Sequence, residues 1–326
     1  MERMNLHPNE DIMVKPAKQE NVIEITGPTN IVSVIGADTY YGSHMVSHLA
    51  SANRMVYGFS QQKPFSFKQN PIIISGLEKA VIEPAPIVSD CLFICIDPNM
   101  GFDKYVKWMR AFCKEIIAKE YWGRICFLSL GSICRSECDE PISEDTVVSP
   151  RTELDLSLAT AENILEVLKS NEKNLAETTI VRIGVPYGNE TGVDDTCSFV
   201  NHTVKKAMIG EKVGLPIHKA KRSFIHISDI CDSIIKIMSL KYCPDLINIP
   251  GEVLTIHDLV TVFSEFFDIK RESVYCPYND QDFFLGDQHL SATLFNQTVS
   301  YKRRYSMNKW LNELMKQQKT KQNELV

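Results

Sequence analysis

The chain has 326 residues, of which 44% are apolar, and this length allows one large core or two lobes. Its formal net charge of −6 argues against nucleic acid or an anionic membrane as the main partner. The N-terminus is polar, and no apolar run is long enough to span a bilayer, so we expect a soluble, cytoplasmic protein. The ten cysteines lack metal-ligand spacing, which predicts buried thiols in a reducing compartment and no metal site.

The first structured segment is a short β-branched run at residues 31–35 that ends at Gly36. Such a run is typical of a strand buried on both faces of a parallel sheet. Helical spacing follows from Gly42 to Leu49, and a second short strand is expected at residues 55–59. A strand, a glycine turn, a helix and a strand in this order are the opening unit of a doubly wound sheet.

This alternation continues along the chain. Further strands are predicted at residues 72–74, 91–96, 125–128 and 179–183, and helices at residues 105–119 and 152–168. We therefore predict an α/β fold of Rossmann type with a parallel sheet.

Four parts of the chain are expected. They are a flexible N-terminal arm at residues 1–27, a dinucleotide-binding-type domain at residues 28–190, a smaller lobe interleaved with it at residues 191–315, and a polar tail at residues 316–326. Within the smaller lobe, residues 247–249 are predicted to form a short strand and residues 256–267 a helix.

The first glycine turn is the candidate cofactor site. In the segment VIGADTYYGSHMVSHL, Gly36 and Gly42 flank a turn from strand to helix, where glycines let the backbone approach a pyrophosphate. Tyr40 and Tyr41 complete this candidate site. Thr39 replaces the middle glycine of the usual pattern, and its side chain obstructs a diphosphate. Alternatively, the glycines serve only the turn and the contact between helix and sheet.

The end of the second strand usually carries an acid that holds the adenosine ribose of a dinucleotide. Here Ser60 and Lys63 are present and the acid is absent. A lysine favours the 2′-phosphate of NADP over NAD, although a solvated loop charge is the alternative explanation. The sequence leaves the binding of NAD or NADP in doubt.

Several segments resemble one family, the extended short-chain dehydrogenase/reductases that act on nucleotide sugars as epimerases, dehydratases and reductases. VIGADTYYGSHMVSHL is similar to the family's TGATGFIGSHLVxxL, and ISEDTVVSPRTELDLSLATAENIL to its EDTPxxPxSxYGxSKxxAENIL. VRIGVPYG resembles LRPxNVYG, KRSFIHISDICDSIIKIM resembles RDFIHVDDVAxAIxxxL, and INIPGEVLTIHDLV resembles YNIGxGExxTIxELV. The resemblance covers about residues 30–310 and implies a Rossmann-type sheet with a smaller C-terminal lobe.

The resemblance also implies where the catalytic groups of the family would lie. The family's tyrosine exchanges a proton with the substrate oxygen, its lysine lowers the pKa of that tyrosine, and a serine or threonine completes the set. The corresponding positions of this chain carry Leu130, Leu154 and Leu158. No leucine transfers a proton, so we expect these side chains to pack together and the site to lack its usual chemistry.

Two further residues match the family's substrate site. Arg222 corresponds to the arginine that contacts the diphosphate of the nucleotide sugar, and Tyr187 lies in the loop after the last main strand. An exposed cation is the alternative for Arg222. His226 and Asp229 are expected to fix a loop and cap the following helix. Asp97 is an additional acid with no assigned role.

Three hypotheses follow. The favoured one is a catalytically silent homologue that serves as a regulatory, scaffold or binding subunit, with a nucleotide or nucleotide sugar as a candidate ligand. The alternatives are an active NAD(P)-dependent nucleotide-sugar epimerase or reductase with rearranged catalytic residues, and a nucleotide-binding sensor.

The resemblance finally implies an assembly. Family members commonly dimerise through the helix of the catalytic tyrosine and the helix before it, which correspond to residues 152–168 and 105–119. We therefore expect a homodimer or another protein partner. The apolar residues of these helices supply groups for either an interface or a core, and they are Val106, Met109, Phe112, Leu156 and Leu165.

Overall fold

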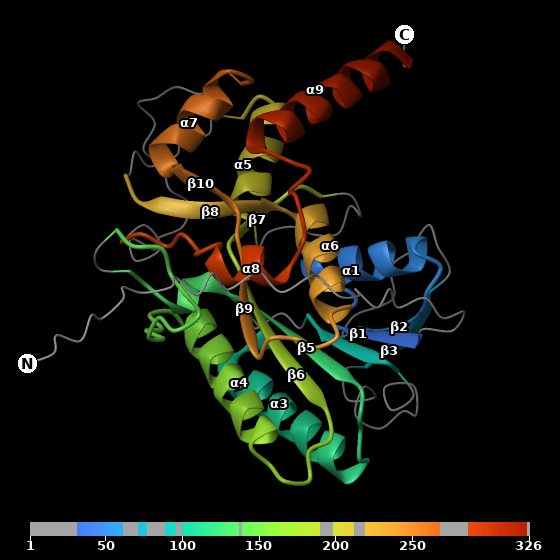
Figure 1. The fold of residues 1–326 in the computed structure, drawn as a ribbon. Coiled ribbons are helices and arrows are strands. Elements are labelled where there is room, and N and C mark those ends of the chain that lie inside the picture. The colour runs from blue at the N-terminus through green and yellow to red at the C-terminus, as the bar shows by residue number, and fades with distance from the viewer. Residues whose placement is uncertain are drawn as a thin grey trace, which may run out of the picture.

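The computed structural model describes residues 31–60, 71–76, 89–95, 100–136, 139–189, 198–211, 219–267 and 286–324. The expected N-terminal arm, Lys63 and Asp97 lie outside these residues. The described part contains a larger parallel sheet and a smaller mixed sheet with helices around them (Figure 1). The predicted doubly wound α/β fold is thereby confirmed.

The larger sheet has seven strands in the described part of the chain, in the order β3-β2-β1-β4-β5-β6-β9. Their bounds are β1 Ile31–Ile35, β2 Met55–Ser60, β3 Ile72–Ser75, β4 Cys91–Ile94, β5 Arg124–Leu130, β6 Glu177–Ile183 and β9 Leu246–Ile249. Each neighbouring pair is parallel. The first strands, β2 and β3, are added on one side of β1, and the later strands, from β4 on, are added on its other side. In such sheets, ligands bind at the carboxyl ends of the two strands where the order changes, which here are β1 and β4.

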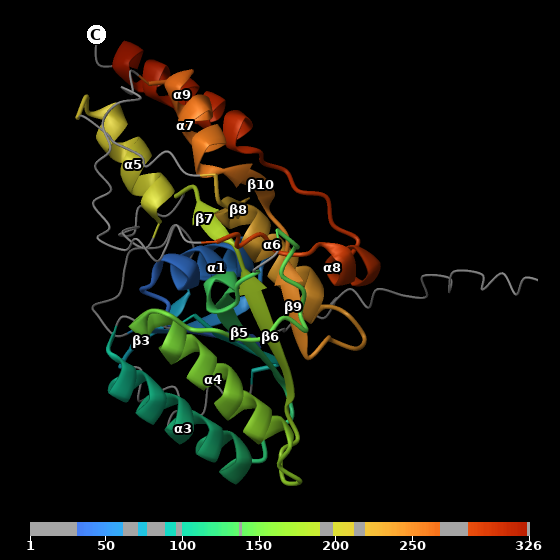
Figure 2. The ribbon, with the colours of Figure 1, turned by 90° about the vertical axis from the view of Figure 1, so that its left-hand side faces the viewer.

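Helices cover both faces of this sheet (Figures 1 and 2). The helices α1 (Tyr40–Ser51) and α6 (Ile227–Met238) pack on one face, and α3 (Phe102–Ala118) and α4 (Glu153–Lys169) pack on the other. The residues of strand β4 explain why both faces are covered. Cys91 and Phe93 belong to the core beneath α1 and α6, whereas Leu92 and Ile94 belong to the core beneath α3 and α4. Alternate residues of a strand face opposite sides, so an entirely apolar strand supplies two cores.

The structure shows the burial of four of the five apolar residues that were predicted on α3 and α4 as interface or core groups. Met109, Phe112 and Leu165 are buried in the core between these helices and the sheet. Leu156 instead remains 45% exposed on the outer face of α4. Three of these side chains are therefore core residues, and Leu156 is available for an interface.

A buried ion pair fastens α4 to strand β6. The guanidinium of Arg182 donates to both carboxylate oxygens of Glu162, from Nε at 3.1 Å and from Nη2 at 2.7 Å. Both residues are buried, and removing one partner of such a pair leaves an uncompensated charge that costs about 3–5 kcal/mol. The pair therefore holds the helix that carries Leu154 and Leu158 in a fixed position on the sheet.

The smaller lobe has its own core. Its sheet has the order β10-β8-β7 in the described residues, with β7 Val185–Tyr187, β8 Lys221–His226 and β10 Glu252–Thr255. The helices α5 (Phe199–Met208), α7 (Ile256–Ser264) and α9 (Met307–Glu324) pack against it, and α8 (Thr293–Thr298) packs near β9. Strand β9 belongs to the larger sheet, next to β6, although it follows β8 in the chain. The chain thus returns from the smaller sheet to the larger one.

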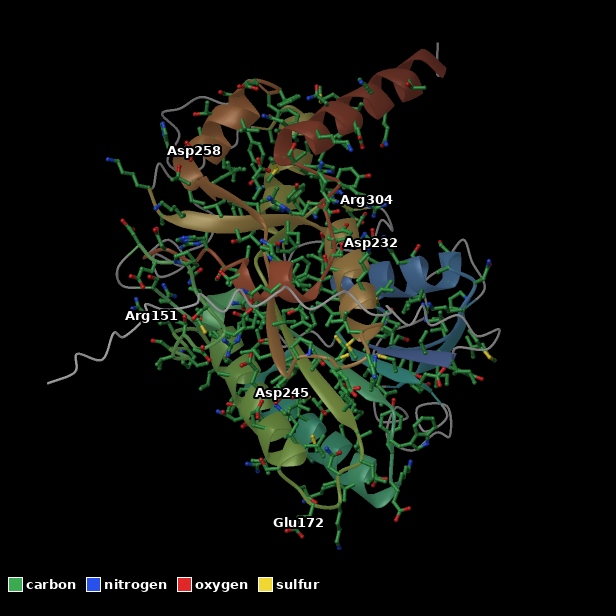
Figure 3. The ribbon with its side chains drawn as sticks, viewed as in Figure 1. Arg151, Glu172, Asp232, Asp245, Asp258 and Arg304 are labelled. Carbon is green, nitrogen blue, oxygen red and sulfur yellow. The ribbon has the colours of Figure 1, made fainter. Side chains whose placement is uncertain are left out.

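The last segment of the chain is tied to α6. Asp229 is fully buried, and its carboxylate accepts hydrogen bonds from the Tyr301 hydroxyl and from the backbone amides of Arg304 and Tyr305. Arg304 also forms an ion pair with Asp232, and Figure 3 labels the two residues next to each other. The residues expected as a polar tail continue α9 as far as Glu324. Among the described helices, none has the length and apolar character needed to cross a membrane.

Candidate functional site

The glycine turn between β1 and α1 has the tight geometry that its sequence predicts. Gly36 adopts φ 88°, a left-handed conformation that favours glycine. A Cβ on Gly42 would lie 1.9 Å from the carbonyl oxygen of Gly36. Both glycines are therefore required by the turn itself, whether or not a ligand approaches it.

Thr39 occupies the N-terminus of α1. Its hydroxyl oxygen accepts a hydrogen bond from the amide of Gly42 at 3.0 Å. The same oxygen lies 2.8 Å from the carbonyl of Gly36 and 2.7 Å from the carbonyl of Cys95, and its single hydrogen serves one of them at a time. Amides at a helix N-terminus are the groups that bind anions. At α1, the Thr39 side chain already satisfies one of these amides, that of Gly42.

Tyr40 connects the glycine turn to the smaller lobe. Its buried hydroxyl donates to the carbonyl of Gly188, in the loop after β7, at 2.5 Å. Asn201 of α5 fixes the same glycine, since its side chain accepts from the Gly188 amide and donates to the Gly188 carbonyl. The ring of Tyr41 contacts the Tyr40 ring edge to face. The structure therefore gives Tyr40 a contact between the lobes.

The three predicted leucines lie together at the carboxyl end of β5. Leu130 is the last residue of β5, and Leu154 and Leu158 lie on the first turns of α4. Leu158 is 2% exposed within the core beneath α3 and α4, and the half-buried Leu130 and Leu154 pack against the same core. Leu158 is thus a core residue, and Leu130 and Leu154 border the same core.

The polar side chains beside the leucines differ in their hydrogen bonding. Asp155 accepts hydrogen bonds from the amides of Arg151 and Thr152 and from the hydroxyl of Ser132, and forms a capping box at the start of α4. Within the described residues, the buried hydroxyls of Ser129 and Ser157 have no hydrogen-bond partner. No tyrosine lies between Tyr121 and Tyr187 in the sequence. The described groups around the leucines include no tyrosine–lysine pair.

Arg222 is fully buried at the start of β8, so the alternative of an exposed cation is wrong. Its Nη1 donates to the carbonyls of Lys221 at 2.8 Å and Gly286 at 2.7 Å. Burial lowers the pKa of Arg222 to about 10, and the nearby charge of Arg135 acts in the same direction, while Asp287 opposes them. The guanidinium therefore joins β8 to the segment before α8.

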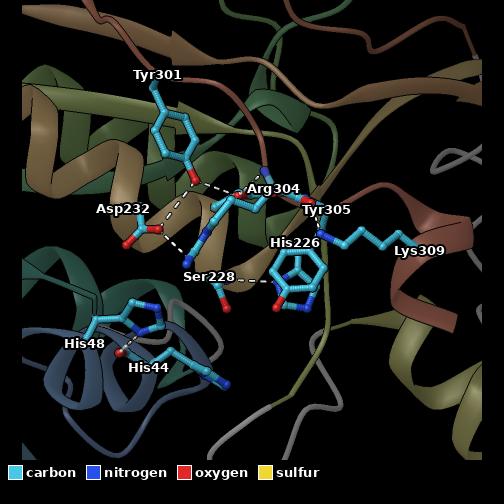
Figure 4. Close-up of polar contacts among 10 residues, drawn as sticks. His44, His48, His226, Ser228, Asp232, Tyr301, Arg304, Tyr305 and Lys309 are labelled. Carbon is cyan, nitrogen blue, oxygen red and sulfur yellow. Dashed lines mark hydrogen bonds and ion pairs between the residues drawn. The ribbon is translucent and has the colours of Figure 1, made fainter. Parts of the chain in front are cut away.

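Tyr187 and His226 form an aromatic group with the C-terminal segment, and Figure 4 shows His226 against Tyr305. The ring of His226 stacks on Tyr305 with centroids 4.0 Å apart, and Tyr187 meets His226 edge to face at 5.3 Å. His226 also caps α6, because its Nδ1 accepts from the amide of Ser228. Burial raises the pKa of Tyr187 above its ordinary value. The predicted structural roles of His226 and Asp229 are confirmed.

The predicted site residues are therefore divided among several places. Ser60 is buried at the carboxyl end of β2, the strand that lies next to β1 in the sheet. Its carbonyl accepts a hydrogen bond from the amide of Gly76. Asn201 and Gly286, which contact predicted site residues, carried no signal in the sequence. Within the described residues, no group of three or more His, Cys, Asp or Glu side chains could hold a metal ion.

A scan against protein-family models and a search of curated protein sequences return no match. Solved structures do match. MoeE5 in complex with UDP-glucuronic acid and NAD is similar with a TM-score of 0.73 and 17% identity, over 86% of this chain and 96% of that chain. A UDP-glucose 4-epimerase of Thermotoga maritima with UDP-glucose gives a TM-score of 0.69 and 16% identity, over 86% and 96% of the two chains.

A third similar structure is the dTDP-glucose 4,6-dehydratase DesIV of Streptomyces venezuelae with NAD bound. Its TM-score is 0.70 at 14% identity, over 85% of this chain and 92% of that chain. At these identities the likeness establishes the fold. The protein therefore has the fold of the NAD-binding nucleotide-sugar epimerases and dehydratases, over nearly the whole length of those chains.

Proposed function

We propose that this protein is a catalytically silent homologue of the NAD(P)-dependent nucleotide-sugar epimerases and dehydratases, acting as a regulatory, scaffold or binding subunit. The observation that carries this proposal is the apolar packing of Leu130, Leu154 and Leu158. These positions correspond, by resemblance, to the family's serine, tyrosine and lysine. A leucine neither donates a proton nor stabilises an oxyanion, and general acid–base groups typically supply about 10²–10⁴-fold in rate.

The glycine turn supports the same proposal. NAD in this fold would place its pyrophosphate at the N-terminus of α1, where backbone amides receive it. Here the amide of Gly42 is bound by the Thr39 hydroxyl, which also lies against the carbonyls of Gly36 and Cys95. The described residues of the turn therefore fit a self-capped helix better than a pyrophosphate site, and we expect weak binding of NAD or NADP.

A nucleotide-binding sensor is the second candidate, because the solved relatives hold NAD and nucleotide sugars in this fold. Arg222 is the observation that favours it, since a buried cation at the corresponding position suits an anionic ligand. Its Nη1 atom already binds two backbone carbonyls, so a diphosphate at this atom would have to displace a carbonyl.

Nicotinamide absorbance in the presence of UDP-glucose, UDP-glucuronic acid or dTDP-glucose tests the proposal. The unmodified protein should neither oxidise nor reduce these sugars with NAD or NADP, and calorimetric titration of each cofactor should show weak binding or none. Clear cofactor-dependent turnover would establish the active alternative. Tight binding without turnover would establish the sensor.

Substitution of serine, tyrosine and lysine for Leu130, Leu154 and Leu158 extends this experiment. We expect the triple variant to remain inactive in the same assays, because Thr39 still caps α1 and the new polar groups lack partners in an apolar core. Recovery of turnover would show that only the three side chains separate this protein from an enzyme.

A further inference from the structure

A half-buried serine directly before α9 follows the one pair of adjacent arginines in the chain. The pair is Arg303 and Arg304, which stand three and two residues before Ser306. Both arginines are exposed. Residues 299–306 form neither helix nor strand and connect α8 to α9. A hydroxyl and two cations at fixed spacing therefore lie together at the surface, in a segment without regular secondary structure.

This spacing is a pattern that enzymes can read. Protein kinases select their substrates in part by the charges around the acceptor hydroxyl. Arginines two and three residues before a serine suit a kinase whose cleft carries carboxylates at those two places, because guanidinium and carboxylate groups form strong charge-assisted hydrogen bonds. Among the described serines, Ser306 alone has a lysine or arginine at both positions.

The hydroxyl of Ser306 lies at the N-terminus of α9. Its oxygen accepts a hydrogen bond from the amide of Lys309 at 3.3 Å, at the surface of the protein, as the side chain of an N-cap residue does. Glu252 of β10 reaches the same helix end, where its carboxylate accepts from the amide of Met307 at 2.8 Å. Two side chains thus share the free amides at this end of α9, and one of them joins the helix to the smaller sheet.

The charges around Ser306 would both attract and repel an added phosphate. The ammonium group of Lys309 donates to the carbonyl of Arg304 at 2.8 Å and lies over the ring of Tyr305 (Figure 4). A phosphate on serine carries a charge of about −1.5 to −2 at pH 7, and a helix N-terminus and nearby cations stabilise it. The carboxylate of Glu252 at the same helix end would repel it.

We infer that Ser306 is phosphorylated by an arginine-directed serine kinase, and that the phosphate displaces Glu252 from the start of α9. The bond between Ser306 Oγ and the γ-phosphorus of ATP forms, and the bond from that phosphorus to the oxygen it shares with the β-phosphate breaks. The hydroxyl proton passes to a carboxylate base of the kinase, and ADP leaves. This inference adds a regulatory modification to the proposed function and does not rest on it.

Access to a kinase requires this segment to leave α6. Arg304 is paired with Asp232, and the amides of Arg304 and Tyr305 donate to the carboxylate of Asp229. Local opening of a surface segment costs less than global unfolding. Asp232→Asn weakens the hold on the guanidinium that the kinase must bind, so this variant should be phosphorylated several-fold faster than the wild type.

The test uses the full chain, MgATP and the catalytic subunit of cyclic-AMP-dependent protein kinase, which selects arginines at these two positions. Peptide mass spectrometry measures the phosphate on each serine over time. Arg303→Gln should lower the rate at Ser306 by about tenfold or more, because it removes a charge-assisted bond to the kinase. Arg110→Gln, at an exposed arginine of α3, is the matched control and should leave the rate unchanged.

A second serine needs its own control. Ser273 follows Lys270 and Arg271 at the same spacing and lies outside the described residues. Ser273→Ala should leave the phosphorylation of Ser306 unchanged.

Hydrogen–deuterium exchange of β10 tests the effect on Glu252. The amides of residues 252–255 should exchange several-fold faster in the phosphorylated protein, because β10 loses its link to α9. Glu252→Gln removes the repelled charge, so phosphorylation should accelerate exchange less in that variant.

The inference is overturned by the absence of phosphate on Ser306 or by equal rates for Arg303→Gln and Arg110→Gln. It is also overturned if Asp232→Asn is phosphorylated no faster than the wild type, or if exchange of β10 is unchanged by phosphorylation. None of these measurements involves turnover of a nicotinamide cofactor, so a failure here leaves the proposal of catalytic silence standing.

Discussion

The glycine turn and the start of α4 both lie at the carboxyl end of the parallel sheet, and different interactions hold their side chains. At the turn, the hydroxyl of Thr39 finds three backbone partners close by. At the start of α4, Leu158 belongs to the core and Leu154 packs against it. A polar side chain at a helix end makes local hydrogen bonds, whereas an apolar side chain depends on everything packed around it.

This difference predicts how each region responds to a substitution. The cap at Thr39 is one side chain on a helix end, so removing it should alter the turn without unfolding the protein. Leu158 is 2% exposed among aromatic and aliphatic side chains, so a charged group there has no partner within the core. The two regions should therefore respond very differently to substitution.

The largest effect is expected from Leu158→Lys. A lysine at this position buries an unpaired charge in an apolar core, and we expect a loss of about 3–5 kcal/mol in the free energy of unfolding. Leu156→Lys is the matched control, because that side chain lies on the same helix and is half exposed. It should change stability by about 0.5 kcal/mol or less. Urea denaturation followed by circular dichroism measures both, and similar losses would contradict the assignment of Leu158 to the core.

Gly42→Ala should have the next largest effect. Its Cβ would meet the carbonyl oxygen of Gly36 at 1.9 Å, so the backbone must move and we expect a loss of about 1–3 kcal/mol. Ser47→Ala, at a half-buried position on the same helix, is the control and should remain near wild type. A stable Gly42→Ala protein in thermal denaturation would show that the turn is looser than the structure has it.

Removal of the Thr39 cap should cost less. Thr39→Val keeps the shape of the side chain and loses the hydroxyl, so we expect a loss of about 1 kcal/mol, while Thr39→Ser should retain most of the stability. Thr39→Gly frees the amide of Gly42 and should tighten the binding of NAD in calorimetric titration. Unchanged NAD binding by Thr39→Gly would show that other residues close the pyrophosphate position.

The smallest effect concerns a histidine beside the leucine core. Burial lowers the pKa of His289 below its ordinary value, against the opposing charge of Asp287. The unfolded chain then binds a proton more readily than the folded one, so stability is lost as the pH falls through the ordinary histidine range of about 6.5. His289→Gln should lose less stability than wild type between about pH 7 and about pH 5.5. Denaturation curves at the two values measure this, and parallel losses would contradict it.

Much of the first lobe could be predicted from the sequence. The β-branched runs and the helical spacings gave strands and helices within a few residues of those observed, because these patterns depend on which side chains face a core. The glycine turn was predicted for the same reason, since a strand followed by Gly36 and Gly42 permits few conformations. The contact of Leu130, Leu154 and Leu158 with one core is consistent with their apolar character.

The burial of Arg222 and the contact of Tyr40 with Gly188 could not be predicted in this way. An arginine among lysines has the local pattern of an exposed cation, and only the approach of Gly286, more than sixty residues later, shows where its guanidinium points. The sequence analysis also made no prediction of α9, because polar residues at a chain end are compatible with a tail or with a helix.

The sequence by itself determined the order of strands and helices along the chain, the glycine turn and the apolar character of positions 130, 154 and 158, because each depends on residue type and on spacing over a few residues. The tertiary structure alone decided that the Thr39 hydroxyl lies against the carbonyl of Cys95 and that Asp229 holds the C-terminal segment. These features join residues far apart in the chain, and their energies come from burial and from hydrogen bonds that exist only once the strands and helices have packed.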